Sequence, residues 1–119
     1  ELICLFGCGG DRDRTKRPEM AAIAQKLADR IIVTSDNSRT EKTSDIMADI
    51  KAGLDLNGRS RSLFIEDREE AIRTAIMIAP QGATILLAGK GHETYQITGT
   101  EKRHFNEKEI VSEIFSTME

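Results

Sequence analysis

A chain of 119 residues suits a single domain with its own hydrophobic core. Hydrophobic residues make up 39% and charged residues 31%, with a net charge of −3, so the chain has no basic footprint for nucleic acid or a membrane surface. No apolar run approaches the roughly 20 residues that a membrane span needs. We expect Cys4 to be a small buried hydrophobe and Cys8 to be structural, in a reducing, cytoplasmic compartment.

The chain alternates between short apolar runs and stretches of helical periodicity. We expect strands over residues 2–6, 31–33, 62–65 and 83–88. Three helices separate them: the first runs from Pro18 to near Asp29, the second is capped by Thr43 or Ser44, and the third is capped by Asp67. The second helix carries Ile46, Met47, Ile50 and Leu54 on one face. On the first helix, the residues at helical spacing are Met20, Ile23, Ala24, Leu27 and Ala28. Four strand–helix units predict a parallel sheet with helices on both faces.

The last third of the chain breaks this alternation. Residues 95–98 and 102–105 predict a small hairpin or an antiparallel edge. Asn106 is expected to cap a final helix that turns Ile110, Val111, Ile114 and Phe115 inward. The predicted fold is therefore an α/β, Rossmann-like three-layer domain with a mostly parallel sheet and an antiparallel edge near the C-terminus. We expect the domain to fill residues 1–119 and to be part of a larger protein.

Polar segments follow the first, second and fourth predicted strands, over residues 7–17, 34–41 and 89–93. The carboxyl ends of parallel strands meet at one edge of the sheet, where ligands of such folds bind. The side chains brought to this edge are Asp11, Arg12, Asp13, Lys16, Arg17, Asp36, Asn37, Arg39, Lys90, His92 and Glu93. A cluster with both signs of charge favours a small zwitterionic or anionic ligand.

Two common phosphate-binding loops do not fit the glycine-rich segments. The Rossmann fingerprint places a third glycine where this chain has Arg12, so classical dinucleotide binding is disfavoured. The segment from Gly89 to Gly91 lacks the glycine-lysine-serine/threonine ending of a Walker loop. His92 and Glu93 could form a metal or acid–base pair, but with only two histidines in the chain a histidine-rich metal site is not expected. Taken alone, Arg39 could be an exposed loop arginine, and Arg12 could pair with a neighbouring aspartate.

Taken together, these segments resemble the C-terminal domain of the Mur ligase family, most closely the members that add the third amino acid of the peptidoglycan stem peptide. The segments that carry the resemblance are Phe6 to Asp13, Lys16 to Pro18, Thr34 to Glu41 and Gly89 to Gln96. They occur in the family's order and spacing over essentially the whole chain.

The resemblance implies an ATP-dependent, amide-bond-forming reaction in the cytoplasm. ATP would phosphorylate the glutamate carboxylate of UDP-N-acetylmuramoyl-L-alanyl-D-glutamate, and the amine of meso-diaminopimelate would attack the acyl phosphate. In such ligases an N-terminal domain holds the UDP-sugar, and a central domain binds ATP and Mg²⁺. The resemblance therefore implies that the chain lacks the phosphate-binding loop because that loop lies on another domain, and that the isolated domain is inactive, with no catalytic residue or metal ligand of its own.

The family's amino-acid recognition positions can be carried over one by one. They match Arg12, Asp36, Asn37, Ser38, Arg39, Gly89 and Glu93. The arginines would bind the carboxylate at the far end of meso-diaminopimelate, since a guanidinium donates two hydrogen bonds to a carboxylate. Gly89 and Glu93 would receive the ammonium group. L-Lysine has only the ammonium and would leave Arg39 unpaired.

Ser38 departs from the family, which usually has proline at this position. Proline would restrict φ, so serine is expected to leave the loop more mobile while Arg39 still reaches the ligand. Asp11 is expected on the nucleotide side of the cleft. The alternatives left open are an L-lysine-adding ligase of the same family, a non-catalytic module that binds a nucleotide or an amino acid, and a fragment of a Rossmann oxidoreductase.

Overall fold

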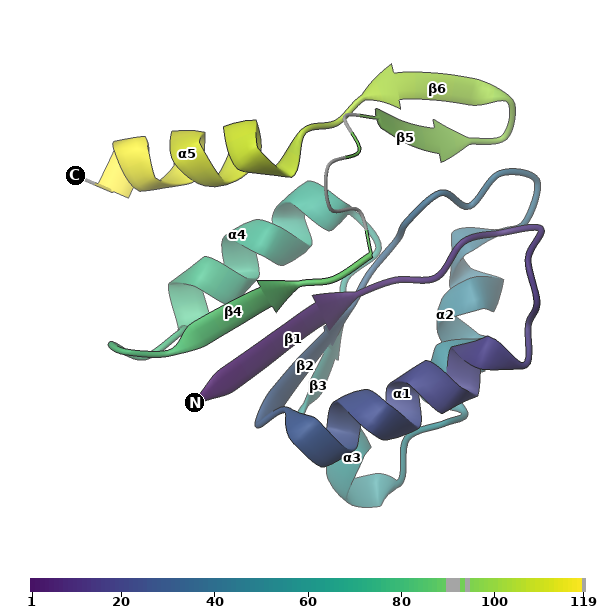
Figure 1. The fold of residues 1–119 in the computed structure, drawn as a ribbon, viewed down its shortest axis with the longest axis horizontal. Helices are drawn as coiled ribbons and strands as arrows, with labels where there is room; N and C mark the ends of the chain where they lie inside the picture. Colours follow the sequence, from purple (N-terminus) through teal and green to yellow (C-terminus); the bar gives the residue numbers. More distant parts are fainter. Residues whose placement is uncertain (90–92, 94, 119) are drawn as a thin grey trace.

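The computed structural model describes residues 1–89, 93 and 95–118, and its core is a parallel sheet with the strand order β3-β2-β1-β4 (Figure 1). The strands of this sheet are β1 (Leu2–Phe6), β2 (Arg30–Val33), β3 (Ser62–Phe64) and β4 (Thr84–Leu87). The helices are α1 (Lys16–Leu27), α2 (Thr43–Lys51), α3 (Leu56–Ser60), α4 (Arg68–Ile78) and α5 (Glu107–Met118). The predicted α/β class, with helices on both faces, is confirmed.

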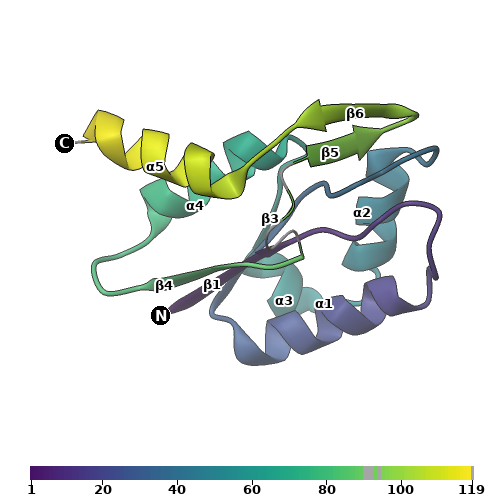
Figure 2. The ribbon, with the colours of Figure 1, turned by 45° about the horizontal axis from the view of Figure 1, so that its top comes forward.

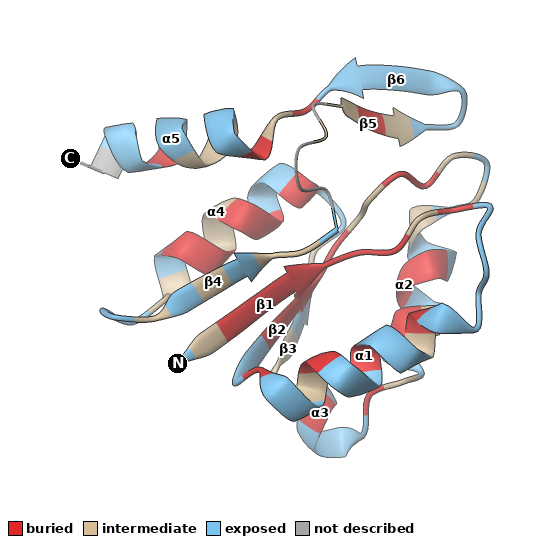
Figure 3. Ribbon diagram, viewed as in Figure 1, coloured by how far each residue is buried: buried red, intermediate tan, exposed pale blue. Residues whose placement is uncertain are grey.

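The two faces of the sheet are buried by different helices (Figures 1 and 2). Cys4 and Phe6 of β1 pack with α1 and α2, whereas Ile3 and Leu5 pack with α4 and α5. Alternate residues of the strand point to opposite faces, so a strand covered on both faces has to be apolar throughout. The central strands β1 and β2 accordingly form the continuous buried band in Figure 3.

Helix α1 buries only part of the stripe predicted for it, since Ala24 and Ala28 are buried, at 8% and 6%. Met20, Ile23 and Leu27 are exposed, at 39%, 60% and 68%. The buried stripe has small residues and one arginine at positions i, i+4, i+7 and i+11, namely Arg17, Ala21, Ala24 and Ala28. Alanines let the helix lie close to the sheet, which explains why the larger side chains were excluded from this interface.

The helix boundaries show which capping predictions hold. Asp67 caps α4, since its carboxylate accepts a hydrogen bond from the Glu70 amide at 3.2 Å. Asn106 likewise accepts from the Glu109 amide in the first turn of α5, at 3.3 Å. The predicted cap of α2 is wrong, because the helix already includes Thr43 and its N-cap residue makes no side-chain bond. The short helix α3 was not predicted, although its Asp55 cap is a recognisable signal.

The antiparallel pair near the C-terminus is confirmed and forms its own sheet of β5 (Tyr95–Thr98) and β6 (Glu101–His104). Helix α5 then returns to pack near α4 (Figure 2). Ile114 is 3% exposed, as predicted, but Phe115 is 48% exposed rather than inward. No helix in the described part of the chain has both the length and the apolarity to cross a membrane.

Strand order determines which loops meet. Strand β1 lies between β2 and β4, with Phe6 paired to Val33 and Leu5 paired to Leu87. The segments leaving these three strands therefore emerge side by side at one edge of the sheet. We name them the β1 loop (residues 7–15), the β2 loop (34–42) and the β4 loop (88–94, of which 88, 89 and 93 are described).

Candidate functional site

The β1 and β2 loops are in direct backbone contact. The Gly10 amide donates to the Asn37 carbonyl at 2.7 Å, and a Cβ on Gly10 would lie 1.7 Å from the Ser38 carbonyl oxygen. A Cβ on Gly7 would likewise lie 2.4 Å from the Thr34 carbonyl oxygen. Only glycine fits at these two positions, because a Cβ atom would push the two loops apart.

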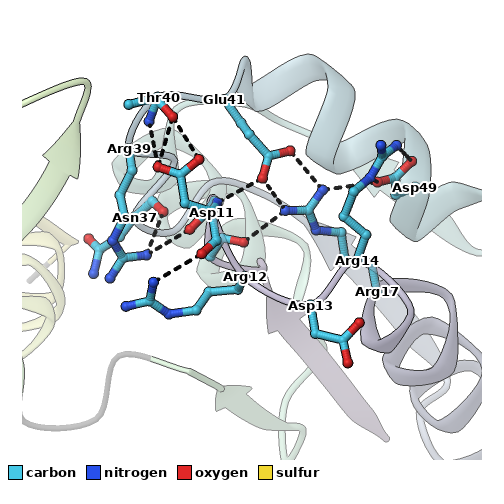
Figure 4. Close-up of polar contacts among 12 residues, drawn as sticks. Asp11, Arg12, Asp13, Arg14, Arg17, Asn37, Arg39, Thr40, Glu41 and Asp49 are labelled. Atoms are coloured by element: carbon cyan, nitrogen blue, oxygen red, sulfur yellow. Dashed lines mark hydrogen bonds and ion pairs between the residues drawn. The ribbon is translucent and has the colours of Figure 1, made fainter.

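Two arginines, Arg12 from the β1 loop and Arg39 from the β2 loop (Figure 4), lie close to Gly9. A Cβ on Gly9 would lie 3.1 Å from Arg39 Nη1 and 3.6 Å from Arg12 Cγ. Arg39 Nη1 donates to two backbone carbonyls, and Arg12 Nη1 donates to the Asp11 carbonyl at 3.1 Å. Within residues 1–89, 93 and 95–118, neither arginine forms an ion pair. Two guanidinium groups without a carboxylate partner make this point of the edge favourable for an anion.

The backbone at the site is held in an uncommon conformation. Asp11 and Arg39 are the non-glycine residues with positive φ in the described chain, at 55° and 53°. The Asp11 carboxylate accepts hydrogen bonds from the Thr40 hydroxyl at 2.6 and 2.8 Å and from the Thr40 amide at 3.3 Å. Asp11 thus connects the β1 loop to the β2 loop directly beside Arg39. Such strain persists only where surrounding contacts hold it in place.

A buried arginine, Arg17, forms hydrogen bonds with both the β1 loop and the β2 loop. Arg17 is 1% exposed and donates to Glu41 at 2.7 and 3.0 Å, to Asp49 at 2.9 Å and to the Gly9 carbonyl at 3.0 Å (Figure 4). The bonds from Arg17, with one from the Asp11 amide, lower the pKa of Glu41 to about 2. Hydrogen bonds from Arg14 and Arg17 also lower the pKa of Asp49. Both carboxylates therefore remain charged at neutral pH and hold Arg17 under the site.

The β4 loop reaches the β2 loop through its described residues. Asn37 Nδ2 lies 3.4 Å from Glu93 Oε1. Gly89 has φ of 107°, and a Cβ there would lie 3.5 Å from Asp36 Oδ2. Glu93 and Gly89 thus both lie beside the tetrapeptide at 36–39. The remaining parts of this motif, Lys90, Gly91 and His92, lie outside the described residues.

The β5–β6 hairpin covers the outer side of the β2 loop. The Ile97 amide donates to Asn37 Oδ1 at 2.9 Å, and the Arg39 amide donates to the Ile97 carbonyl at 3.3 Å. Gln96 donates from Nε2 to Ser35 Oγ at 2.9 Å and to the Asp36 carbonyl at 3.1 Å. The hairpin therefore fixes the backbone of the tetrapeptide.

The structure brings all the proposed site residues to one edge but gives them different surroundings. Arg39, Asp36 and Glu93 are partly exposed, whereas Asn37 and Ser38 are buried at 5% and 2%. Asn37 directs its amide group to Glu93 and to the hairpin, so its contacts are within the protein.

Two arginines, Arg17 and Arg68, are buried at 1% and 0% exposure, although Arg17 was expected among the charged side chains of the ligand-binding edge. Each lies on the buried stripe of its helix, with small or apolar residues following at helical spacing. An arginine at the first turn of such a stripe is the sequence signal that could have identified them.

The cysteines do not form a reactive site. Cys4 and Cys8 are unpaired and buried, and burial raises the pKa of Cys8 to about 11. In the described part of the chain, no three His, Cys, Asp or Glu side chains form a group that could hold a metal ion.

The fold and the site define a class of protein: an α/β domain that gathers Arg12, Arg39 and Glu93 at the carboxyl edge of its parallel sheet. Residues 1–91 match the family described as "Mur ligase, glutamate ligase domain". The chain belongs to the Mur ligase family.

Individual relatives agree with this assignment. The chain is 60% identical to the UDP-N-acetylmuramoyl-L-alanyl-D-glutamate–2,6-diaminopimelate ligase of Synechococcus elongatus over 109 residues, which are 92% of this chain and 22% of the relative. It is 52% identical to the ligase of the same name from Bacteroides fragilis, over 98% of this chain and 24% of the relative. A solved structure with that name superposes with a TM-score of 0.94 at 42% identity, over 99% of this chain and 24% of the other. The chain thus spans about a quarter of the length of these relatives.

Proposed function

We propose that this chain is the domain that selects the incoming amino acid in an ATP-dependent ligase, which adds meso-diaminopimelate to UDP-N-acetylmuramoyl-L-alanyl-D-glutamate in peptidoglycan synthesis. The observation that carries the proposal is the pair Arg12 and Arg39 against Gly9, without a carboxylate partner in the described chain, next to the loop that holds Glu93. The names of the relatives, which are diaminopimelate ligases, support the same substrate.

In this proposal the two kinds of charged group bind opposite charges at the far end of the amino acid. Arg39, with Arg12 beside it, binds the carboxylate, and Glu93 with the Gly89 carbonyl receives the ammonium group. L-Lysine carries no carboxylate there and would leave the Arg39 guanidinium without its partner. A hydrogen bond to a charged group contributes about 1.5–3 kcal/mol. Since about 1.4 kcal/mol corresponds to a factor of ten, one such bond is enough for strong discrimination.

The other parts of the reaction belong, in this proposal, to domains outside this chain. ATP supplies the phosphoryl group that activates the glutamate carboxylate. A central domain would bind ATP and Mg²⁺, and an N-terminal domain would bind the UDP-sugar. This chain would close over them as one domain of residues 1–119 and orient the attacking amine. Asp11 would face the nucleotide side, where it also fixes Thr40 beside Arg39. The unpaired thiols of Cys4 and Cys8 suit the reducing cytoplasm.

The proposal is tested by phosphate release from the full-length ligase with ATP, Mg²⁺ and the UDP-muramoyl-dipeptide. Meso-diaminopimelate is expected to support turnover far better than L-lysine. Equal rates would contradict the specificity, and a preference for L-lysine would favour the lysine-adding alternative. Titration of the isolated chain with ATP and with meso-diaminopimelate tests the non-catalytic alternative, because a dedicated binding module would bind its ligand without the other domains.

A further inference from the structure

A second buried arginine connects the backbones that precede the two halves of the site. Arg68, the first residue of α4, is 0% exposed. Its Nη1 donates to the Ser35 carbonyl at 2.9 Å, and its Nη2 donates to the Ala88 carbonyl at 3.0 Å. Ser35 directly precedes the tetrapeptide at 36–39, and Ala88 directly precedes Gly89. One guanidinium therefore holds the start of both binding segments.

The hydrogen bonds of the sheet do not connect the ends of β2 and β4, whereas Arg68 does. Strands β2 and β4 are not neighbours, because β1 lies between them. Ladder hydrogen bonds therefore set the spacing of each strand from β1, and Arg68 links the two outer loops directly, past the end of β1. A planar guanidinium fixes the directions of its donors, whereas a lysine ammonium is a single rotatable point charge.

The charge of Arg68 is balanced by the start of α5. Its Nε donates to Glu107 Oε2 at 2.9 Å, and Glu107 is 7% exposed. Glu107 follows the β5–β6 hairpin, which itself covers the β2 loop through Gln96. The ion pair therefore keeps the guanidinium in place and joins the C-terminal elements to the same point.

We propose that Arg68 is a positioning residue for amino-acid selection. It fixes the separation between the β2 loop, which carries Arg39, and the β4 loop, which carries Gly89 and Glu93. This rests on the proposed function, in which those loops bind the carboxylate and the ammonium of one ligand. Discrimination against L-lysine requires both ends to be held at the right distance, so loosening Arg68 should reduce discrimination and not merely the amount of folded enzyme.

The test compares Arg68→Lys with the unaltered full-length ligase, using meso-diaminopimelate and L-lysine as substrates. We expect KM for meso-diaminopimelate to rise at least fivefold and the ratio of the two kcat/KM values to fall about tenfold, while KM for ATP stays within twofold. Arg73→Lys is the matched control, because Arg73 lies on the same helix but is 41% exposed, and its ion pair among the described residues is with the exposed Glu70 at 3.8 Å. It should leave all these values unchanged.

A second variant separates positioning from stability. Arg68→Met combined with Glu107→Leu removes both buried charges together, and such replacements are often neutral for folding. This double variant leaves no unpaired buried charge, but the Ser35 and Ala88 carbonyls lose their donor. It should therefore melt above the single Arg68→Met variant yet lose discrimination as Arg68→Lys does. A lower melting temperature with an unchanged substrate ratio in both variants would show a purely structural ion pair and overturn the proposal. If the unaltered ligase itself does not prefer meso-diaminopimelate, the proposed function fails, and the role of Arg68 in selection fails with it.

Discussion

Replacing Gly10 by alanine tests the contact between the β1 and β2 loops. The new Cβ would lie 1.7 Å from the Ser38 carbonyl oxygen, and folded proteins essentially never place a Cβ closer than 3.0 Å to such an atom. The loops must therefore separate by about 1.3 Å. This movement would strain the 2.7 Å hydrogen bond from the Gly10 amide to Asn37 and carry Arg39 away from its position.

The size of the effect follows from this displacement. Overpacking a well-packed contact costs about 1–3 kcal/mol. At about 4 °C per kcal/mol for a domain of this size, Gly10→Ala should lower the melting temperature by about 4–12 °C. A misplacement of about 1 Å can cost a factor on the order of 100 in activity. We therefore expect KM for meso-diaminopimelate in the full-length ligase to rise on the order of 10- to 100-fold.

Gly9→Ala is the matched control for this experiment. Its Cβ would meet the end of the flexible Arg39 side chain at 3.1 Å and no backbone atom closer than 3.8 Å. The chain should therefore melt within about 2 °C of the unaltered one, with a rise of a few-fold in KM. The assays are thermal unfolding of the 119-residue chain by circular dichroism and steady-state kinetics of the ligase. If Gly10→Ala changes neither quantity, the loops are not packed as described and the reasoning is refuted.

Two further substitutions and one alkylation experiment probe the same edge. Arg39→Ala should raise KM for meso-diaminopimelate at least tenfold through loss of a carboxylate contact, and steady-state kinetics showing an unchanged KM would remove Arg39 from the site. Arg17 lowers the pKa of Glu41 to about 2, below its ordinary 4.5, so this stabilisation is fully present above pH 4.5 and is lost as the pH falls toward 2. Glu41→Gln should therefore lower stability to urea at pH 7 and flatten its fall between pH 4.5 and 2, and identical pH profiles would disprove the coupling. Burial raises the pKa of Cys8 from 9.0 to about 11, so iodoacetamide at pH 8 should alkylate Cys8 about 100-fold more slowly in the folded chain than in urea, as mass spectrometry would show.

The sheet and the meeting of its loops could be predicted because they depend on local patterns. Continuous apolar runs such as 2–6 and 31–33 are typical of strands covered on both faces, and the alternation with helices determines a parallel sheet. The stripe of α1 could not be predicted from hydrophobicity alone. Met20, Ile23 and Leu27 have the right spacing for a core face, but close approach to the sheet requires the alanines instead.

The charged network of the site was harder to predict than its location. Segments 7–17 and 34–41 were expected at one edge. The stripe of α1 could have indicated that Arg17 is buried, but its partners Glu41 and Asp49 lie 24 and 32 positions away and depend on the completed fold. The contacts of Arg68 join residues 20 to 39 positions away, so they depend on the completed fold. The positive φ of Arg39 is likewise imposed by the contacts around it and not by its own preference.

We propose that Arg39 makes this domain select an amino acid with a carboxylate at its far end. The most direct measurement is the ratio of kcat/KM for meso-diaminopimelate to that for L-lysine, in the full-length ligase and in its Arg39→Ala variant. We predict a ratio of at least about 30 in the unaltered ligase, from one or more charge-assisted hydrogen bonds, and a ratio within about threefold of one in the variant. Equal use of both amino acids by the unaltered ligase, or an undiminished preference in the variant, would contradict the claim.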